Sequence, residues 1–518
     1  MPISKILVAN RSEIAIRVFR AANELGMKTV AIWAEEDKLA LHRFKADESY
    51  QVGRGPHLAR DLGPIESYLS IEEVIRVAKL SGADAIHPGY GLLSESPEFA
   101  DACAENGIIF IGPKPETMRR LGNKVAARNL AIEIGVPVVP ATDPLPDDMD
   151  EVARMADEIG YPIMLKASWG GGGRGMRAIR DPKDLAREVI EAKREAMAAF
   201  GKDEVYLEKL VERARHVESQ ILGDTHGNAV HLFERDCSVQ RRNQKVVERA
   251  PAPYLSEEQR QQLAAYSLKI ANATGYVGAG TIEYLMDIDT GAFYFIEVNP
   301  RIQVEHTVTE EVTGIDIVKA QIHILEGEVI GTPESGVPPQ SEIRLNGHAL
   351  QCRITTEDPE QNFIPDYGRI TAYRGATGFG IRLDGGTAYS GAVITRFYDP
   401  LLEKVTAWAP TPEETIHRMD RALREFRIRG VATNLTFLEA IIGHPEFLNN
   451  TYTTRFIDST PELFEQVKRQ DRATKLLTYL ADVTVNGHPE TKGRPLPLAD
   501  AAAPRVPHVE SEVKPGTR

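Results

Sequence analysis

The 518-residue chain contains only three cysteines, Cys103, Cys237 and Cys352. An odd and widely spaced set of thiols excludes a disulfide framework and a clustered-thiolate metal site. No apolar stretch approaches the roughly 20 residues that a membrane-spanning helix needs, and no secretory hydrophobic segment follows Met1. The sequence therefore predicts a cytoplasmic protein that has no membrane partner.

Basic side chains are outnumbered by acidic ones, with 61 Lys and Arg against 75 Asp and Glu and a formal net charge of -14. Because an acidic surface repels phosphate backbones and anionic lipids, we expect no nucleic-acid partner. The remaining composition, 42% hydrophobic and 26% charged, is typical of globular domains. At about 150 residues per domain, the length predicts about three of them.

The first 122 residues alternate between strand and helix patterns. Short apolar runs at 3–9 and 28–33 flank a helical pattern at 13–24, and similar runs recur at 83–87 and 107–112. Such βαβ succession predicts an α/β fold that begins with a doubly wound parallel sheet.

Further along, the pattern divides the chain again. A compact unit at 139–210 has strands at 161–167 and 176–179 around a glycine run, and from 211 to 335 strands precede helices. Residues 345–450 hold short glycine-rich strands, then helices at 412–426 and 432–442. The stretch 493–518 is rich in proline without periodicity, which is typical of a linker or tail.

The glycine run at 169–175 holds five glycines in six positions. It formally contains the dinucleotide pattern G-x-G-x-x-G, but that pattern must open a helix, whereas a strand follows here. No Walker A sequence occurs. A strand–loop–strand flap whose backbone amides close over phosphates fits better, with Lys166 adding a point charge. The alternative is a glycine-rich hairpin without a ligand, and the entropy cost of so many glycines argues against it.

Two carboxylates face each other in the hairpin predicted for 281–299. With a three-residue Asp289–Gly291 loop and Ile288 opposite Ala292, Glu283 lies opposite Glu297. Opposed acids repel unless a positive charge lies between them. On this register one face also carries Thr281, Leu285, Phe293, Phe295 and Asn299. We predict Mg²⁺ bridging nucleotide phosphates, with Asn299 as a third oxygen ligand; a solvated hairpin face is the alternative.

Directly after this hairpin, Arg301, Gln303 and Glu305 alternate along the chain. In an extended segment all three would point the same way. The set suits a small planar oxyanion, with arginine for charge, glutamine for orientation and glutamate as base. A surface strand of alternating polarity is the alternative.

A basic segment stands out upstream, where Arg241, Arg242 and Lys245 lie close together in an otherwise acidic chain. A solvated basic turn and an anion site beside a nucleotide explain it about equally well.

Several long motifs, at 6–15, 87–91, 166–175, 241–245 and 297–306, together resemble biotin carboxylase over residues 1 to about 455. That family has an ATP-grasp fold and is shared by acetyl-CoA, propionyl-CoA and pyruvate carboxylases. The resemblance implies an N-terminal preATP-grasp domain at 1–122 and an ATP-grasp domain at 123–335 with a glycine-rich lid at about 139–210. It also implies an α+β C-terminal domain at 340–455.

Finer features resemble the pyruvate carboxylases. Ser12 stands where acyl-CoA carboxylases usually have glycine, and Asn243 where they often have histidine. The segments 453–458 and 472–489 are similar to the run that leads into the carboxyltransferase domain, so 456–492 is expected to begin that connection. The chain has no Ala-Met-Lys-Met biotin-attachment motif and no room for a carboxyltransferase barrel. We therefore expect an N-terminal portion of a pyruvate carboxylase, the alternative being a separately encoded subunit.

The resemblance implies binding sites for ATP and for Mg²⁺, possibly two ions, with Mn²⁺ as a substitute. Two lysines would hold phosphates under the flap, residues 208–210 would meet adenine, and two further residues would lie near the sugar. The expected nucleotide contacts are Lys124, Lys166, Gly171, Gly172, Gly173, Met176, Glu208, Lys209, Leu210, His216 and Gln240. The expected metal ligands are Glu283, Glu297 and Asn299.

The resemblance also implies the chemistry. Arg301, Gln303 and the Val304 backbone would seat bicarbonate while Glu305 removes its proton, and attack on the γ-phosphate would give carboxyphosphate. Carboxyphosphate would yield CO₂ and phosphate, which deprotonates biotin. The residues expected to act beside these are Lys245, which balances charge, Arg353, which stabilises the biotin enolate, and Glu218, an acid whose role stays open.

The implied partners are bicarbonate, a biotin carrier domain and a carboxyltransferase domain that converts pyruvate to oxaloacetate. Acetyl-CoA is a further candidate, with Arg427, Arg429 and Arg472 for its phosphates, and a homodimer or tetramer is expected. Three alternatives stay open: the biotin carboxylase subunit of an acyl-CoA carboxylase, another bicarbonate-activating ATP-grasp ligase such as a carbamoyl-phosphate synthetase, and a catalytically silent ATP-binding module.

Overall fold

A computed structural model describes residues 2–168, 176–465 and 472–488 of the chain. It contains two units, Met1–Gln466 and Val467–Arg518, so the predicted borders near 122, 335 and 455 fall within the first unit. In the second unit, α17 (Arg472–Asn486) exposes Leu476, Leu477 and Val485. Among the described residues, none of the helices is both long and apolar enough to cross a membrane.

The N-terminal sheet is parallel, as the strand and helix alternation predicts. Its strands, in the spatial order β3-β2-β1-β4-β5, are β1 (Lys5–Val8), β2 (Lys28–Trp33), β3 (Glu48–Gln51), β4 (Ala85–His87) and β5 (Ile109–Phe110). The helices of this part are α1 (Ser12–Glu24), α2 (Leu41–Lys45), α3 (Pro64–Leu69), α4 (Ile71–Ser81), α5 (Pro97–Glu105) and α6 (Pro115–Gly122). The next helix, α7 (Lys124–Glu133), packs in a separate core with Ile282 and Phe295.

Alternate residues of β1 enter two different cores. Ile6 and Val8 pack with α1 and with α12 (Ile317–Glu326), whereas Leu7 and Ala9 pack with α4 and α5. Just beyond the strand, the Asn10 amide donates to the carbonyls of Pro88 (2.8 Å) and Tyr90 (2.9 Å). The motifs at 6–15 and 87–91 therefore meet at the carboxyl edge of the sheet, where α/β folds bind ligands.

The lid is a three-stranded antiparallel sheet of order β7-β6-β8, whose core is shared with two helices. Its elements are α8 (Met149–Ile159), β6 (Ile163–Ala167), β7 (Arg177–Ile179), α9 (Leu185–Phe200) and β8 (Val205–Lys209). Strand β6 ends just before the glycine run and β7 starts just after it, as predicted, but the run itself, with Gly171, Gly172 and Gly173, lies outside the described residues.

An eight-stranded sheet carries most of the remaining chain, in the order β13-β12-β9-β10-β11-β14-β21-β19. These strands are β9 (Ala214–Gly223), β10 (Ala229–Arg241), β11 (Gln244–Ala250), β12 (Gly278–Asp287), β13 (Phe293–Asn299), β14 (His348–Thr355), β19 (Ile381–Gly385) and β21 (Leu401–Ala409). Because β11 pairs with β14, the predicted ATP-grasp and C-terminal domains share one continuous sheet.

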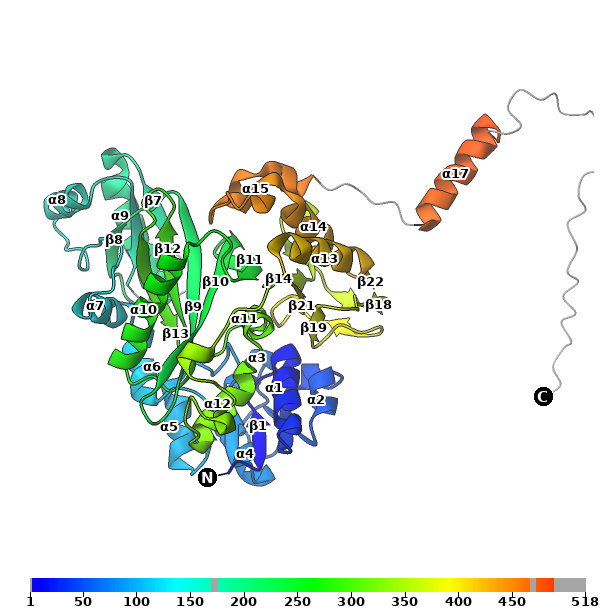
Figure 1. Cartoon of the computed structure of the whole chain (residues 1–518), viewed down its shortest axis with the longest axis horizontal. Helices are drawn as coiled ribbons and strands as arrows, with labels where there is room; N and C mark the ends of the chain where they lie inside the picture. The colour runs from blue at the N-terminus through cyan, green and yellow to red at the C-terminus, as the bar shows by residue number, and fades with distance from the viewer. Residues whose placement is uncertain (1, 169–175, 466–471, 489–518) are drawn as a thin grey trace, which may run out of the picture. The chain divides into compact units, whose positions relative to one another are not determined.

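Helices and short strand pairs complete the first unit (Figure 1). The further helices are α10 (Glu257–Ala273), α11 (His306–Thr313), α13 (Pro412–Glu425), α14 (Leu435–Gly443), α15 (Pro445–Leu448) and α16 (Phe456–Ser459). The short strands pair as β15 (Glu357–Asp358) with β16 (Ile364–Pro365), β17 (Gly368–Arg369) with β20 (Val393–Ile394), and β18 (Ala372–Arg374) with β22 (Arg427–Arg429).

Candidate active site

A cavity of about 1400 Å³ lies between the N-terminal sheet, the lid and the eight-stranded sheet. It brings together residues that are distant in sequence, from Asn10 to Asp458. The predicted site residues that line it are Lys124, Lys166, Met176, Glu208, Lys209, Leu210, His216, Gln240, Lys245, Glu283, Glu297, Asn299, Arg301, Gln303, Val304, Glu305 and Arg353. Glu218 is fully buried and does not line the cavity, so its contact with a ligand would be indirect.

The β12–β13 hairpin has the predicted pair but a different turn. Glu283 does lie opposite Glu297. The loop, however, is the four residues between Asp287 and Ala292, whose N–H and carbonyl are hydrogen bonded (2.9 Å), and not a three-residue loop closed by Ile288 and Ala292. A bulge between Glu283 and Tyr284 absorbs the one-residue difference.

The bulge also corrects the predicted face of the hairpin. Tyr284 lies opposite Phe295, and their rings contact each other edge-on at 6.2 Å in the hydrophobic core. Phe293 and Phe295 therefore pack mainly on the core side of the hairpin, although Phe295 also reaches the cavity wall. Glu283 and Glu297 line the cavity.

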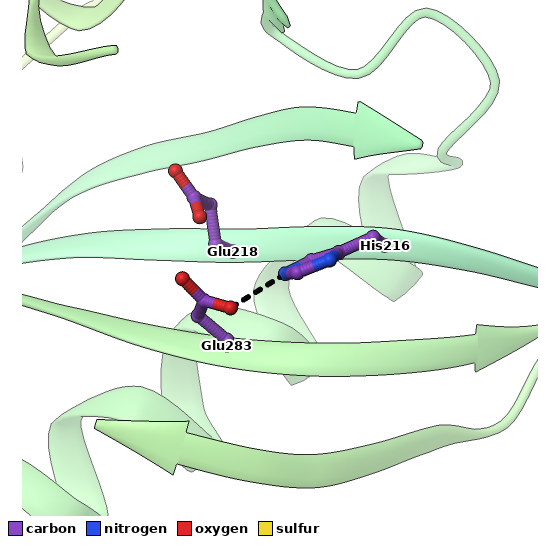
Figure 2. Close-up of side chains that lie close together, drawn as sticks. All are labelled: His216, Glu218 and Glu283. Atoms are coloured by element: carbon purple, nitrogen blue, oxygen red, sulfur yellow. Dashed lines mark ion pairs between the residues drawn. The ribbon is translucent and has the colours of Figure 1, made fainter. Parts of the chain in front are cut away.

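The ammonium group of Lys245 is the centre of a buried charge cluster. It donates to Glu218 (2.5 Å), Glu283 (2.9 Å) and Glu305 (2.7 Å). Glu218 and Glu283 extend from neighbouring strands, with the His216 ring beside Glu283 at 2.8 Å (Figure 2). Three acids that would repel one another are thus held by one cation.

This cluster changes the protonation of its members. Burial alone would lower the pKa of Lys245, but the three carboxylates raise it well above its ordinary value. Burial would raise the pKa of Glu283, whereas Lys245 and His216 hold it well below its usual range. The pKa of Glu305 is lowered in the same way by Lys245, Arg353 and Arg235 against the effect of burial. All three groups are therefore charged at neutral pH.

Residues 300–305 differ from the predicted extended segment. The chain bends at Arg301 and turns at Val304 and Glu305 before α11 begins at His306. Gln303 and Glu305 still reach the same cluster, because the Gln303 amide donates to Glu283 at 2.8 Å. Arg301 points elsewhere and donates to Glu95 (2.6 Å) and Asn299 (3.1 Å).

Glu305 lies between two cations. One oxygen accepts from Lys245, and the other is 3.0 Å from Arg353. Arg353 is anchored in turn on the fully buried Glu248, to which its Nε donates at 2.6 Å. The arrangement presents an ionised carboxylate and a guanidinium to the cavity side by side.

Two lysines, Lys124 and Lys166, line the cavity at the end where the nucleotide is expected, and local structure places both of them. Lys124 is the first residue of α7, which Asn123 caps through the N–H of Ala126 (3.0 Å), and a helix N-terminus suits anionic phosphates. Its ammonium is 3.2 Å from Glu297. On β6 the buried Ile163 and Leu165 alternate with Lys166, which therefore faces the cavity.

The lid strand β8 brings three further predicted residues to the cavity. Glu208 accepts a hydrogen bond from Lys166, and Lys209 donates to the carbonyl of Gly160 (2.8 Å). The Leu210 N–H, just after the strand, donates to the Pro162 carbonyl (3.1 Å). The end of β8 and Leu210 therefore form part of the cavity wall.

The predicted basic segment is a tight turn whose cations separate. Arg242 and Asn243 both have left-handed backbone angles, φ 49° and 63°, as a two-residue hairpin requires. Arg241 lies 4.1 Å from the Phe363 ring and donates to Asn362 at 2.7 Å. Only Lys245 of the three cations joins the carboxylate cluster in the described structure.

The donor set of the hairpin fits Mg²⁺. Glu283, Glu297 and Asn299 offer oxygen atoms alone, which magnesium prefers, and all three line the cavity. The mixed group of His216, Glu218 and Glu283 is also close enough to hold a metal. Glu218, however, is fully buried and does not line the cavity, so this group is not open to the nucleotide phosphates.

Several contributors to the site are not apparent in the sequence. Glu95, on the loop after β4, pairs with Arg301, and Lys404, which is fully buried, donates to the Val304 carbonyl at 3.0 Å. Arg235 lies beneath the cavity with no exposed surface. Charged residues in the middle of long apolar strands were the available signal, since such groups need partners when buried.

Three family models match successive segments of the chain. The N-terminal domain of biotin carboxylase matches residues 2–118, the ATP-binding domain of the carbamoyl-phosphate synthase L chain matches 123–332, and the biotin carboxylase C-terminal domain matches 351–459. The biotin carboxylase domain of Hydrogenobacter thermophilus 2-oxoglutarate carboxylase, solved with MgADP, ADP and bicarbonate, is 44% identical with a TM-score of 0.84. The match covers 90% of this chain and 100% of that one. The chain belongs to the biotin carboxylase family. Its predicted preATP-grasp, ATP-grasp and C-terminal α+β architecture is thereby confirmed.

The chain is also similar to much longer proteins. It is 51% identical over 498 residues to the pyruvate carboxylase of Bacillus subtilis (strain 168), across 96% of this chain and 43% of that protein. A solved variant of Rhizobium etli pyruvate carboxylase, bound to the allosteric activator acetyl coenzyme A, is 86% identical with a TM-score of 0.87. That match covers 98% of this chain and 45% of the other. The chain thus spans about two fifths of the length of the curated relatives it matches.

Proposed function

We propose that the chain is the biotin carboxylase region of a pyruvate carboxylase. It would activate bicarbonate with MgATP and carboxylate a biotin carried on another domain, and a carboxyltransferase domain would then convert pyruvate to oxaloacetate. The observation that carries the catalytic part is Glu305, an ionised carboxylate held between Lys245 and Arg353 at the wall of the cavity.

The proposed chemistry assigns one task to each side chain. Glu305 takes the proton of bicarbonate, whose oxygen attacks the γ-phosphorus of ATP, so that ADP leaves and carboxyphosphate forms. Lys245 stabilises the negative charge that develops on the transferred phosphoryl group. Carboxyphosphate then breaks into CO₂ and phosphate, and the phosphate accepts the proton of the biotin ureido nitrogen. Arg353 stabilises the resulting enolate, which attacks CO₂.

The remaining residues bind and orient the reactants. Lys124 and Lys166 would hold the nucleotide phosphates, and Gln303 and Val304 would seat bicarbonate. Arg301, which lines the cavity beside Gln303 and Val304, would leave Glu95 to join them. The residues that would hold Mg²⁺ are Glu283, Glu297 and Asn299. When bound, the ion supplies positive charge that neutralises the phosphates.

Pyruvate is the proposed carboxyl acceptor because the resemblance to pyruvate carboxylases extends past the biotin carboxylase part. The matches to curated pyruvate carboxylases cover 94–99% of this chain, beyond the end of the biotin carboxylase C-terminal domain match at residue 459. The carbamoyl-phosphate synthetase alternative is less well supported, because biotin carboxylase domains match on both sides of the ATP-binding part.

The test is the release of ADP from MgATP with and without bicarbonate, and then with free biotin. We expect turnover that requires bicarbonate and rises with biotin. Turnover that requires bicarbonate but ignores biotin would point to another acceptor. Tight ATP binding without turnover, also after addition of the carrier and carboxyltransferase domains, would favour the silent ATP-binding module.

Acetyl-CoA activation is a second part of the proposal. Arg427 and Arg429 are exposed on β22, and Arg427 lies opposite Arg374 on β18. This strand pair therefore carries three arginines, whose guanidinium groups suit the phosphates of acetyl-CoA. The Rhizobium etli relative is solved with this activator. The side chain of Arg472 lies outside the described residues and stays a prediction, as does the homodimer or tetramer.

For this activator we expect Arg427→Ala combined with Arg472→Ala to weaken acetyl-CoA binding at least about tenfold, because each charge-assisted hydrogen bond contributes about 1.5–3 kcal/mol. Calorimetric titration of the chain with acetyl-CoA measures this. Arg424→Ala, an exposed arginine paired with Asp420 on α13, is the matched control. An unchanged dissociation constant in the double variant would refute the assignment.

A further inference from the structure

Arg235, on β10, is a fully buried arginine directly beneath the cavity. Each of its five N–H groups has an acceptor. Nε donates to Glu218 (2.6 Å), and Nη1 donates to two oxygen atoms, as does Nη2. Those four acceptors are Gln220 (2.8 Å), Thr309 (3.0 Å), Thr281 (3.0 Å) and Gln303 (3.1 Å). A guanidinium satisfied in this way is fixed in one orientation.

The acceptors of Arg235 belong to four separate parts of the fold. Glu218 and Gln220 lie on β9, Thr281 on β12 and Thr309 on α11. Gln303 lies in the bend between β13 and α11. One side chain therefore holds the wall of the cavity together from below, without lining the cavity itself.

Two of these contacts reach the proposed reaction. Arg235 donates to the oxygen of the Gln303 amide, so the nitrogen of that amide must face the other way, where it donates to Glu283 at 2.8 Å. Arg235 also holds one oxygen of Glu218, whose second oxygen accepts from Lys245. The orientation of the amide and the position of the ammonium thus both depend on the same guanidinium.

We propose that Arg235 is a positioning residue for bicarbonate. It fixes the Gln303 amide with its N–H groups toward the cavity and, through Glu218, holds Lys245 in the carboxylate cluster. This role rests on the proposed function, because it presupposes that Gln303 seats bicarbonate. It also gives Glu218 a task that needs no contact with substrate: the carboxylate links Arg235 to Lys245.

Lysine at position 235 would keep the positive charge but would no longer fix the orientation of the Gln303 amide. An ammonium has three donors instead of five and no planar fork, so it cannot bind Glu218, Gln303 and the two threonines together. The Gln303 amide would then be free to turn its oxygen toward an incoming anion. Losing or misdirecting one hydrogen bond to an anion lowers the affinity for that anion at least about tenfold.

The experiment compares Arg235→Lys with the wild type in ADP release, varying bicarbonate and MgATP separately. We expect the KM for bicarbonate to rise at least about tenfold while the KM for MgATP stays within about twofold. Arg249→Lys is the matched control. Arg249 is equally buried in the same sheet but bonds to His348 and Asn450, and it does not line the cavity.

A double-mutant cycle separates positioning from folding. If Arg235 acts through Gln303, Arg235→Lys should add little to the bicarbonate KM of Gln303→Ala, whereas independent sites would add in free energy. Should Arg235→Lys fail to fold, Thr309→Val serves instead, because it removes one acceptor of Arg235 and little volume. We expect a smaller rise, still confined to bicarbonate.

The outcomes separate this role from the function on which it rests. A wild type without bicarbonate-dependent turnover would overturn the proposed function and the positioning role together. A wild type with that turnover, and variants that weaken bicarbonate and MgATP equally or match Arg249→Lys, would overturn the positioning role alone. Additive effects in the cycle would likewise refute action through Gln303.

Discussion

We expect Glu305→Gln to lower bicarbonate-dependent ATP cleavage roughly 10²- to 10⁴-fold, the range that a positioned general base contributes. Glutamine keeps the size of the side chain and can still accept from Lys245, but it cannot take a proton. The carboxylate touches Lys245 and Arg353 without contacting the lysines at the nucleotide end. MgATP affinity should therefore stay nearly unchanged, and ADP release together with calorimetric ATP binding measures both quantities.

The matched control for Glu305 is Glu342→Gln, an exposed carboxylate outside the cavity. It should retain wild-type turnover. Because the pKa of Glu305 is held below its usual range, the wild-type rate should not fall on the acid side until pH drops below that range. A Glu305→Gln variant that keeps turnover within tenfold would remove this residue from the role of base.

Local sequence patterns predict the fold well where they alone determine the structure. Short apolar runs predicted four of the five parallel strands, because burial on both faces leaves a readable run, whereas the polar edge strand β3 was missed. The Glu283 and Glu297 pair was predicted correctly, yet the turn that joins their strands was not. A bulge beside Tyr284 shifts the register by one residue, and a bulge leaves no fixed signature in the spacing of side chains.

The same limit explains the error at residues 301–305. Alternating polarity suggested an extended chain, but the segment bends because α11 starts at His306 and Glu305 takes the capping position before it. Gln303 and Glu305 reach one cluster through tertiary contacts with Lys245 and Glu283, which come from other strands. Sequence spacing carries no information about such partners.

Buried charge was the feature least accessible from sequence. Glu234, Arg235 and Asp236 appear as a charged run, which is usually solvated, yet all three are buried. Their partners lie on β9, β12, α10, α11 and the loop between α15 and α16, so only the assembled fold shows that the charges are satisfied. The resemblance to a family supplied site residues whose contacts no local pattern predicts.

Lys245→Met should produce the largest loss of stability of any single change in this site. Methionine has similar volume but no charge, so Glu218, Glu283 and Glu305 would face one another without their shared cation. Removing one partner of a buried ion pair costs about 3–5 kcal/mol, because the remaining charge stays desolvated. Urea denaturation at pH 8 should show a lower midpoint, and Lys269→Met, an exposed lysine on α10, should change it by less than about 0.5 kcal/mol.

The loss from Lys245→Met should depend on pH with a definite sign. In the wild type the lowered pKa values of Glu283 and Glu305 contribute stability above the ordinary carboxyl range, and this is lost as pH falls through the lowered values. Without the ammonium, burial and mutual repulsion raise those pKa values, so the variant loses stability as pH rises. The raised pKa of Lys245 keeps its own contribution constant below about pH 10. The difference in unfolding free energy between the two proteins should therefore be largest near pH 8 and should shrink toward pH 4, where the carboxylates of the variant are protonated but the wild type still keeps most of its contribution. A difference independent of pH would mean that the three carboxylates are not neutralised by Lys245.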